Sequence, residues 1–355
     1  MRSVVRSSLL ILFLFSVTAH AEEAVTLRQA IRSALDNNNE LNAKGWSLKA
    51  VESRKSVARS YLLPSVKIEE RFSRTNNPTY IFMSKLNQER FAPTDFAVNS
   101  LNNPDPVNNY QTVFSFEQPV FAKKAWVALD MANKSLEAEK LGLERFKEKT
   151  VLDVFSAYIG VLTASQYREV SEKGLEDARV HLRIAELRYN SGLGLYSDVL
   201  RVRVAVLEAE KTIAGTEKEL KLAKRMLGLL MGRGEPVGVT GNDFPRIAVG
   251  EIDVYLENSL QRRDLKAMEA MYNNALNSVR LAEADFYPVI GVGGSYELND
   301  HVRPLGSEGD SWQIMAFLRI NLFDGLRSRS ERARAESQVR AAYEYLDGME
   351  RLRRA

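Results

Sequence analysis

The chain has 355 residues, with 49 Lys and Arg, 46 Asp and Glu, three His and no Cys. A net charge of +3 gives no global electrostatic footprint for nucleic acid. The lack of Cys excludes disulfides, thiolate zinc sites and a cysteine nucleophile, and three His leave little for acid–base chemistry. The composition therefore argues against an enzyme and predicts no metal site and no cofactor.

The first 21 residues have the features of a secretory signal peptide. A basic start precedes a short apolar run over residues 9–17, and Ala19-His20-Ala21 fits a small-residue cleavage motif. The apolar run is too short to span a bilayer comfortably, although an uncleaved N-terminal anchor is the alternative. We expect cleavage after Ala21, so that the mature chain is secreted, periplasmic or in an outer membrane.

Two runs in the first part of the chain alternate apolar and polar residues. The first, residues 65–72, follows Pro64, which ends the preceding helix because the residue before a proline is disfavoured in the helical region. The second run covers residues 110–118 and alternates less strictly. Alternation over about ten residues predicts strands with one apolar face, of the length that a tilted membrane-spanning strand needs.

Two long helices are predicted next. Residues 122–189 contain no Pro, and residues 197–231 carry apolar side chains at a seven-residue repeat, which predicts a left-handed coiled coil. The link between them is short, so we expect an antiparallel hairpin with the link at its tip, or else a soluble helical bundle. The heptad positions are Val199, Val206, Ile213, Leu220 and Leu227, with Val202, Ala209, Thr216, Ala223 and Leu230 three residues further on.

The second part of the chain repeats the first. Alternating runs at 290–298 and 312–322 predict two more strands, and the repeats align Pro64 with Pro288 and Phe121 with Phe323. Only residues 324–355 follow the last strand, so the second repeat lacks most of its helical hairpin. We expect a fragment, a premature stop or an unusually short family member. The predicted domains are a signal peptide at 1–21, a first repeat at 22–250 and a second repeat at 251–355.

The four predicted strands are too few to close a barrel. An open sheet edge in lipid would leave N–H and C=O groups unpaired, so several copies sharing one barrel would pair every edge. The alternative is two soluble hairpins packed on the helices. The side chains that we expect to face lipid are Val66, Ile68, Phe72, Phe114, Phe116, Ile290, Val292, Tyr296, Ile314, Leu318 and Ile320.

Several short motifs occur in a fixed order along nearly the whole mature chain. They are Gln118-Pro119-Val120-Phe121, Asn321-Leu322-Phe323-Asp324-Gly325, residues 58–64, 282–288 and 188–192, and the segment 197–200. In this order the chain resembles the TolC-type outer-membrane efflux and secretion channel family. The resemblance implies a mainly α fold with β strands: a homotrimer with four strands per protomer in one outer-membrane barrel, continued by a periplasmic tunnel of long antiparallel helices. It also implies docking to a periplasmic adaptor (membrane fusion) protein and, through it, to an inner-membrane pump.

The tip of the helical hairpin is the principal candidate site. Its apolar Leu193 and Leu195, at a solvent-facing turn, predict a docking patch. The alternative is a plain link in which Ser197 or Asp198 caps the second helix. The full adaptor-docking tip comprises Gly192, Leu193, Gly194, Leu195, Tyr196, Ser197 and Asp198. The resemblance also implies an aperture gate near the tip, for which the candidates are Tyr189, Arg201 and Asp198.

The predicted function is that of a passive outer-membrane conduit, in a tripartite efflux or type I secretion system, that exports small molecules or polypeptides. The alternatives are a periplasmic coiled-coil adaptor, a non-functional truncated fragment and an enzyme. Residues 75–109 are expected to form a solvated extracellular loop. His181 and His301 are far apart in the sequence and show no metal-ligand spacing.

Overall fold

The computed structural model of the chain describes residues 24–241 and 250–354, so the predicted signal peptide lies outside the described residues. The chain divides into two compact units. We call residues 1–43 with 146–248 the hairpin unit, and residues 44–145 with 249–355 the sheet unit. Among the described helices, none combines the length and the apolar character that crossing a membrane requires.

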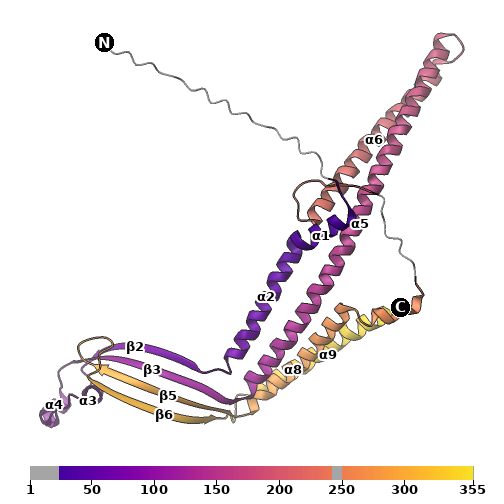
Figure 1. Cartoon of the computed structure of the whole chain (residues 1–355). Coiled ribbons are helices and arrows are strands. Elements are labelled where there is room, and N and C mark those ends of the chain that lie inside the picture. Colours follow the sequence, from indigo (N-terminus) through magenta and orange to yellow (C-terminus); the bar gives the residue numbers. More distant parts are fainter. Residues whose placement is uncertain (1–23, 242–249, 355) are drawn as a thin grey trace, which may run out of the picture. The chain divides into compact units, whose positions relative to one another are not determined.

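Two long helices dominate the hairpin unit, as Figure 1 shows. Helix α5 covers Lys123–Asn190, with its earlier residues in the sheet unit, and α6 covers Tyr196–Leu230. These bounds confirm both long helices predicted from the sequence. Every predicted heptad position of α6 is buried or half-buried, and ion pairs join the two helices from Arg179 to Glu210 and from Arg203 to Glu186. The apolar seam predicted for α6 is therefore the side of the helix that is buried.

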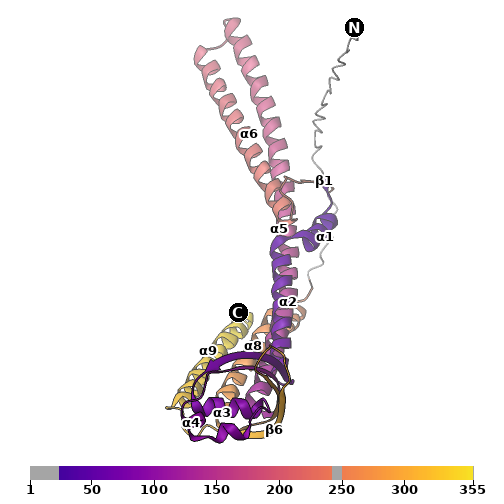
Figure 2. The same ribbon diagram turned by 90° about the vertical axis from the view of Figure 1, so that its left-hand side faces the viewer.

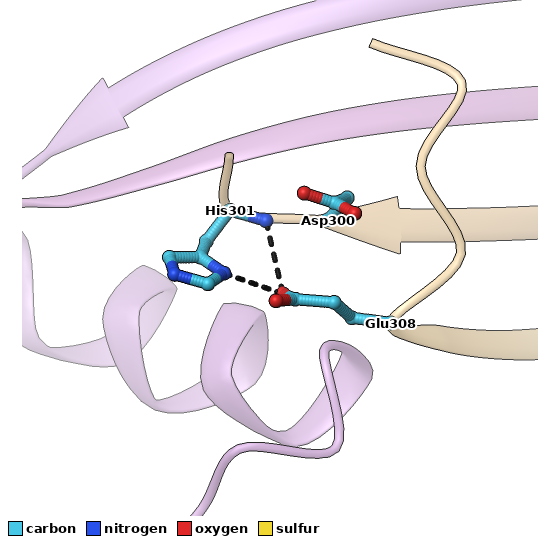
Figure 3. A group of neighbouring side chains, drawn as sticks. All are labelled: Asp300, His301 and Glu308. Atoms are coloured by element: carbon cyan, nitrogen blue, oxygen red, sulfur yellow. Dashed lines mark hydrogen bonds and ion pairs between the residues drawn. The ribbon is translucent and has the colours of Figure 1, made fainter. Parts of the chain in front are cut away.

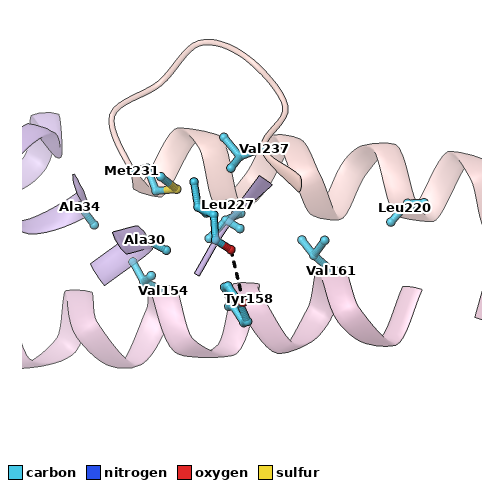
Figure 4. Close-up of a cluster of buried hydrophobic side chains, with 10 residues drawn as sticks. Ala30, Ala34, Val154, Tyr158, Val161, Leu220, Leu227, Met231 and Val237 are labelled. Atoms are coloured by element: carbon cyan, nitrogen blue, oxygen red, sulfur yellow. Dashed lines mark hydrogen bonds between the residues drawn. The ribbon is translucent and has the colours of Figure 1, made fainter. Parts of the chain in front are cut away.

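The core of the hairpin unit lies at the base of this helix pair (Figure 4). It also contains α1 and two short parallel strands that the sequence analysis did not predict; their bounds are α1 Leu27–Asn37, β1 Ala24–Val25 and β4 Gly238–Val239. The Tyr158 hydroxyl donates to the carbonyls of Val25 (3.3 Å) and Thr240 (2.7 Å), and burial raises the pKa of Tyr158. The buried cluster is Val25, Ala30, Ala34, Val154, Tyr158, Val161, Leu220, Leu227, Met231 and Val237.

A single buried amide fixes the start of α2, which covers Asn39–Ser60. The Oδ1 atom of Asn38 accepts a hydrogen bond from the Leu41 amide (3.0 Å), which satisfies a donor in the first turn of α2. Its Nδ2 donates to the Leu230 carbonyl (2.9 Å) at the end of α6. Asn38 therefore joins the end of α1, the start of α2 and the end of α6.

The sheet unit is built on a four-stranded antiparallel sheet in the order β2-β3-β5-β6. Its strands are β2 Ser65–Thr75, β3 Val107–Ala122, β5 Val289–Asp300 and β6 Gly309–Arg319. All four predicted strands are confirmed, although β6 ends before Ile320. A β-bulge interrupts the pairing of β3 with β5 at Pro119 and Phe121. In the described part of the chain, β2 and β6 each have one unpaired edge.

Helices of the sheet unit reproduce the predicted duplication. The order α2, β2, β3, α5 recurs as α8, β5, β6, α9, and α2 and α8 end ahead of Pro64 and Pro288. Asn277 of α8 donates to Asp130 of α5 (2.6 Å), and α8 packs on α9 with the rings of Tyr272 and Tyr343 6.1 Å apart. The bounds are α7 Ile252–Ser259, α8 Arg263–Glu283, η2 Ala284–Phe286 and α9 Arg327–Arg354.

The segment between β2 and β3 is more ordered than predicted. It contains α3 Pro78–Asn87, η1 Pro93–Phe96 and α4 Val98–Asn102, which lie at one end of the sheet (Figure 2). The segment therefore holds short helices where a plain loop was predicted, while most of its residues are exposed to solvent, as expected. Asn77 caps α3, and the hydrogen bond from Lys85 (2.7 Å) lowers the pKa of Asp95. Inside the segment, the Gln88 amide is buried and donates to the Asn108 carbonyl (2.9 Å).

Candidate functional site

One face of the sheet is apolar and exposed to solvent in the single chain. The strand register aligns Ile68, Phe114, Tyr296 and Trp312 in one row across all four strands, and Trp312 is 72% exposed. A contiguous apolar surface of this kind marks a contact with another protein or a membrane. We call it the apolar sheet face. It carries Val66, Ile68, Phe72, Phe114, Phe116, Ile290, Val292, Tyr296, Ile314 and Leu318, which are the predicted lipid-facing residues on the described strands.

The apolar sheet face includes a few polar side chains, among them Glu70, Thr112, Gln118 and Asp310, and the opposite face is mainly polar. On the apolar side, Thr112 donates to the carboxylate of Glu70 (2.5 Å). On the other side, Gln111 donates to Glu297 (3.1 Å) across β3 and β5. The opposite face also carries Lys67, Glu69, Ser115, Ser295 and Gln313. The sheet thus separates an apolar from a polar environment.

The hairpin tip is a short turn between α5 and α6. The amide of Leu193 donates to the Arg188 carbonyl (2.8 Å) and that of Gly192 to the Tyr189 carbonyl (3.0 Å), as in a Schellman motif. Gly192 has φ of 73°, a left-handed conformation that glycine adopts without strain. Leu195 occupies the N-cap position of α6 without a capping side chain.

The predicted cap of α6 is therefore wrong. Helix α6 begins at Tyr196, so Ser197 and Asp198 lie inside its first turn, where the Asp198 amide donates to the Leu195 carbonyl (3.0 Å). Asp198 at this position still favours the helix, since an acidic side chain near the N-terminus interacts well with the helix dipole.

The side chains of the tip fall into an apolar and a polar group. Leu193, at 82%, is one of the most exposed large apolar residues of the described chain, and Leu195 is also exposed. Among the candidate gate residues, Arg201 pairs with Asp198 (3.4 Å), while the rings of Tyr189 and Tyr196 lie 5.4 Å apart. The structure thus brings Asp198 and Arg201 together and places Tyr189 beside a residue predicted for docking.

A third group of side chains was missed by the sequence analysis. Asp300, His301 and Glu308 meet in the turn between β5 and β6, with ligand atoms that all lie within 4.8 Å of one another (Figure 3). His301 had been compared only with the distant His181. The signal that could have revealed the group was the position of Asp300 and Glu308 at the two ends of the predicted turn, with His301 next to Asp300.

Comparison with known proteins covers most of the chain. A family model described as "Outer membrane efflux protein" matches residues 30–233 and 255–351. The fusaric acid resistance protein FusA of Burkholderia cepacia is 26% identical over 259 residues, which are 68% of this chain and 47% of that protein. The chain thus spans about half the length of this curated relative.

Solved structures show the same fold. A membrane protein from Pseudomonas aeruginosa superposes with a TM-score of 0.75 at 20% identity, covering 91% of this chain and 73% of that one. The outer membrane protein VceC of Vibrio cholerae gives 0.71 at 18% identity, covering 91% and 75%. The Campylobacter jejuni CmeC outer membrane channel gives 0.74 at 14% identity, covering 91% and 67%.

These likenesses confirm the predicted fold class, with long antiparallel helices, four strands and an internal duplication. They also confirm the resemblance drawn from the sequence motifs. The matched family is one of efflux proteins, which agrees with the prediction that the chain is not an enzyme. The family model covers most of both repeats, and the chain belongs to the outer membrane efflux protein family.

Proposed function

We propose that the chain is one subunit of an outer-membrane efflux channel in which several copies share a single β-barrel. The observation that carries this proposal is the open sheet, which among the described residues has two unpaired edges and one exposed apolar face. Unpaired strand edges are not tolerated in lipid, and joining copies edge to edge satisfies them. The apolar sheet face then contacts lipid and the opposite, polar face lines a water-filled passage.

Three copies would bring twelve strands into the barrel, a number within the range of outer-membrane barrels. Helices α5 and α6 would extend the passage into the periplasm. The conduit is passive, and a pump in the inner membrane supplies the energy through a periplasmic adaptor. The chain reaches the outer membrane after removal of residues 1–21. FusA is named for resistance to fusaric acid, which fits a small organic acid as one kind of cargo.

Engineered disulfides test the shared barrel directly, because the chain has no Cys of its own. Glu69→Cys on β2 is combined in turn with Ser311→Cys, Gln313→Cys or Met315→Cys on β6. These four positions lie on the polar face of the two edge strands. A disulfide forms only when the two Cα atoms come within about 7 Å, so it reports strand pairing between copies.

We expect at least one double variant to give covalent dimers and trimers on non-reducing gels of oxidised outer membranes. Each single-Cys variant serves as a control and should remain monomeric. Monomers alone for all three double variants would contradict the shared barrel, and recovery of the chain only from the soluble periplasmic fraction would favour the adaptor alternative.

We also propose that the tip docks onto the periplasmic adaptor through Leu193 and Leu195. Their exposure supports this role, because apolar side chains at a solvent-facing turn gain from being covered by a partner. We further propose that the neighbouring Tyr189, Asp198 and Arg201 hold the periplasmic aperture closed. When copies assemble, their contacts within one copy would be replaced by contacts between copies.

Replacing both Leu193 and Leu195 with Asp should abolish photo-crosslinking from Ser191 to the adaptor while assembly in the membrane persists. Two exposed apolar contacts are lost and two charges are placed in the interface, which costs docking energy without disturbing the helices. Leu207→Asp, an exposed site further along α6, is the matched control and should crosslink normally. Undiminished crosslinking of the double variant would remove the tip from the docking interface.

A further inference from the structure

The turn that connects β5 to β6 gathers one imidazole and two carboxylates. Asp300 ends β5, His301 follows it, and Glu308 directly precedes β6. The Nδ1 atom of His301 lies 2.6 Å from Oε2 of Glu308, and the same oxygen accepts a hydrogen bond from the His301 amide (3.1 Å). Figure 3 shows Asp300 and Glu308 on either side of the His301 backbone. The three ligand atoms all lie within 4.8 Å of one another.

Asp300 has an oxygen that its hydrogen bonds leave available. Its side chain is almost fully buried, at 4% exposed. Both of its hydrogen bonds, from the amides of Val302 (2.6 Å) and Arg303 (3.0 Å), go to Oδ1. A carboxylate can accept about four hydrogen bonds, so Asp300 keeps capacity for a further ligand on Oδ2, which lies beside Gly306.

We propose that Asp300, His301 and Glu308 bind a divalent transition-metal ion of the zinc class, a site that goes beyond the proposed channel function. One imidazole nitrogen and two carboxylate oxygens are a ligand set that Zn²⁺ accepts, with water completing the coordination. The two carboxylates bring negative charge, which a divalent cation neutralises. The proposal departs from the prediction, made from composition, that the chain has no metal site.

The surrounding structure holds these ligands in place before any ion arrives. The two amide bonds to Asp300 fix one end of the turn, and Gly306 leaves the space that the Asp300 carboxylate occupies, since a Cβ there would lie 1.9 Å from Oδ2. At the other end, Gly309 packs so closely on the Asn87 carbonyl at the end of α3 that a Cβ would lie 2.2 Å from it. A bound ion would tie the two ends of the turn together on this packed base.

The imidazole distinguishes this site from a general acidic surface. Ca²⁺ and Mg²⁺ prefer oxygen ligands throughout, whereas His nitrogen favours zinc and its neighbours. A zinc-class ion should therefore bind more tightly than Ca²⁺.

The test titrates Zn²⁺ into the full, tag-free chain in detergent, in competition with a chromophoric chelator. We expect one equivalent per chain and an affinity at least ten times that for Ca²⁺. His301→Gln and Glu308→Gln should each weaken Zn²⁺ binding by at least tenfold. His181→Gln on α5 is the matched control and should bind as the unchanged chain does.

A second measurement covers any variant that folds poorly. Co²⁺ bound to the unchanged chain should give visible absorption bands that His301→Gln shifts or removes, with circular dichroism showing that the variant is folded. Zn²⁺ affinity that His301→Gln leaves unaltered, or Ca²⁺ that displaces Zn²⁺ at equal concentration, would overturn the proposal. Those outcomes leave the disulfide test of the barrel untouched, so the two proposals fail separately.

Discussion

Replacing Ile314 with Arg is expected to keep the chain out of the outer membrane, whereas replacing its neighbour Gln313 with Arg should leave insertion intact. Ile314 lies in the middle of β6 on the apolar sheet face and is 72% exposed in the single chain. An Arg on the lipid side of a barrel costs about 2–4 kcal/mol near the bilayer centre, and each copy in the assembly would carry that cost. Gln313 is the adjacent residue of the same strand but faces the opposite side. The two variants therefore add the same charge to the same strand and differ in the side of the sheet that carries it.

Heat-modifiable migration on gels of isolated outer membranes measures the effect. Ile314→Arg should show almost no heat-modifiable species, while Gln313→Arg should match the unchanged chain. Equal insertion of the two variants would mean that the apolar sheet face does not contact lipid. Insertion lost in Gln313→Arg alone would place lipid on the other side of the sheet.

Replacing Leu227 with Ala is expected to lower the free energy of unfolding by about 2–5 kcal/mol, the range for truncating a fully buried Leu. Leu227 is 0% exposed and belongs to the cluster that packs α6 against α5, α1 and the two short strands. Removing its three carbon atoms leaves a cavity that the surrounding backbone cannot fill, because Tyr158 is fixed through hydrogen bonds to both strand segments.

Urea denaturation of the full chain in detergent, followed by circular dichroism, measures this loss. Leu229→Ala is the matched control, since Leu229 is on the same helix but 59% exposed, and substitutions at exposed sites usually change stability by less than about 0.5 kcal/mol. Similar losses in the two variants would show that the core of the hairpin unit does not depend on Leu227.

The sequence was most informative where a periodic pattern continued long enough to exclude other types of secondary structure. The seven-residue repeat from Val199 to Leu230 predicted the buried side of α6, position by position. The alternation in the strands predicted both the sheet and its apolar side, because each face of a strand meets a single environment. The alignment of Pro64 with Pro288 predicted where the helices of the two repeats end.

Features that depend on few residues or on distant contacts were not predicted. Strands β1 and β4 have two residues each, too few for any period, and form because Tyr158 and the helices hold them together. The helices α3 and α4 lie in a segment rich in Pro and Asn, a composition that reads as a loop until contacts such as that of Lys85 with Asp95 stabilise it. The group around His301 forms only when the turn brings Glu308 back to the end of β5.

The pairing of one copy's β2 with the next copy's β6 would be a heterologous contact, since it joins two different surfaces. Contacts of this kind form a closed ring when a whole number of rotations between neighbouring copies adds up to 360°, and an open filament when it does not. The twist of the four strands, together with the bulge at Pro119 and Phe121, sets that rotation. In the proposed shared barrel, the number of copies would therefore depend on the curvature of a single subunit's sheet, and a change that flattens the sheet should yield open polymers in place of a closed ring.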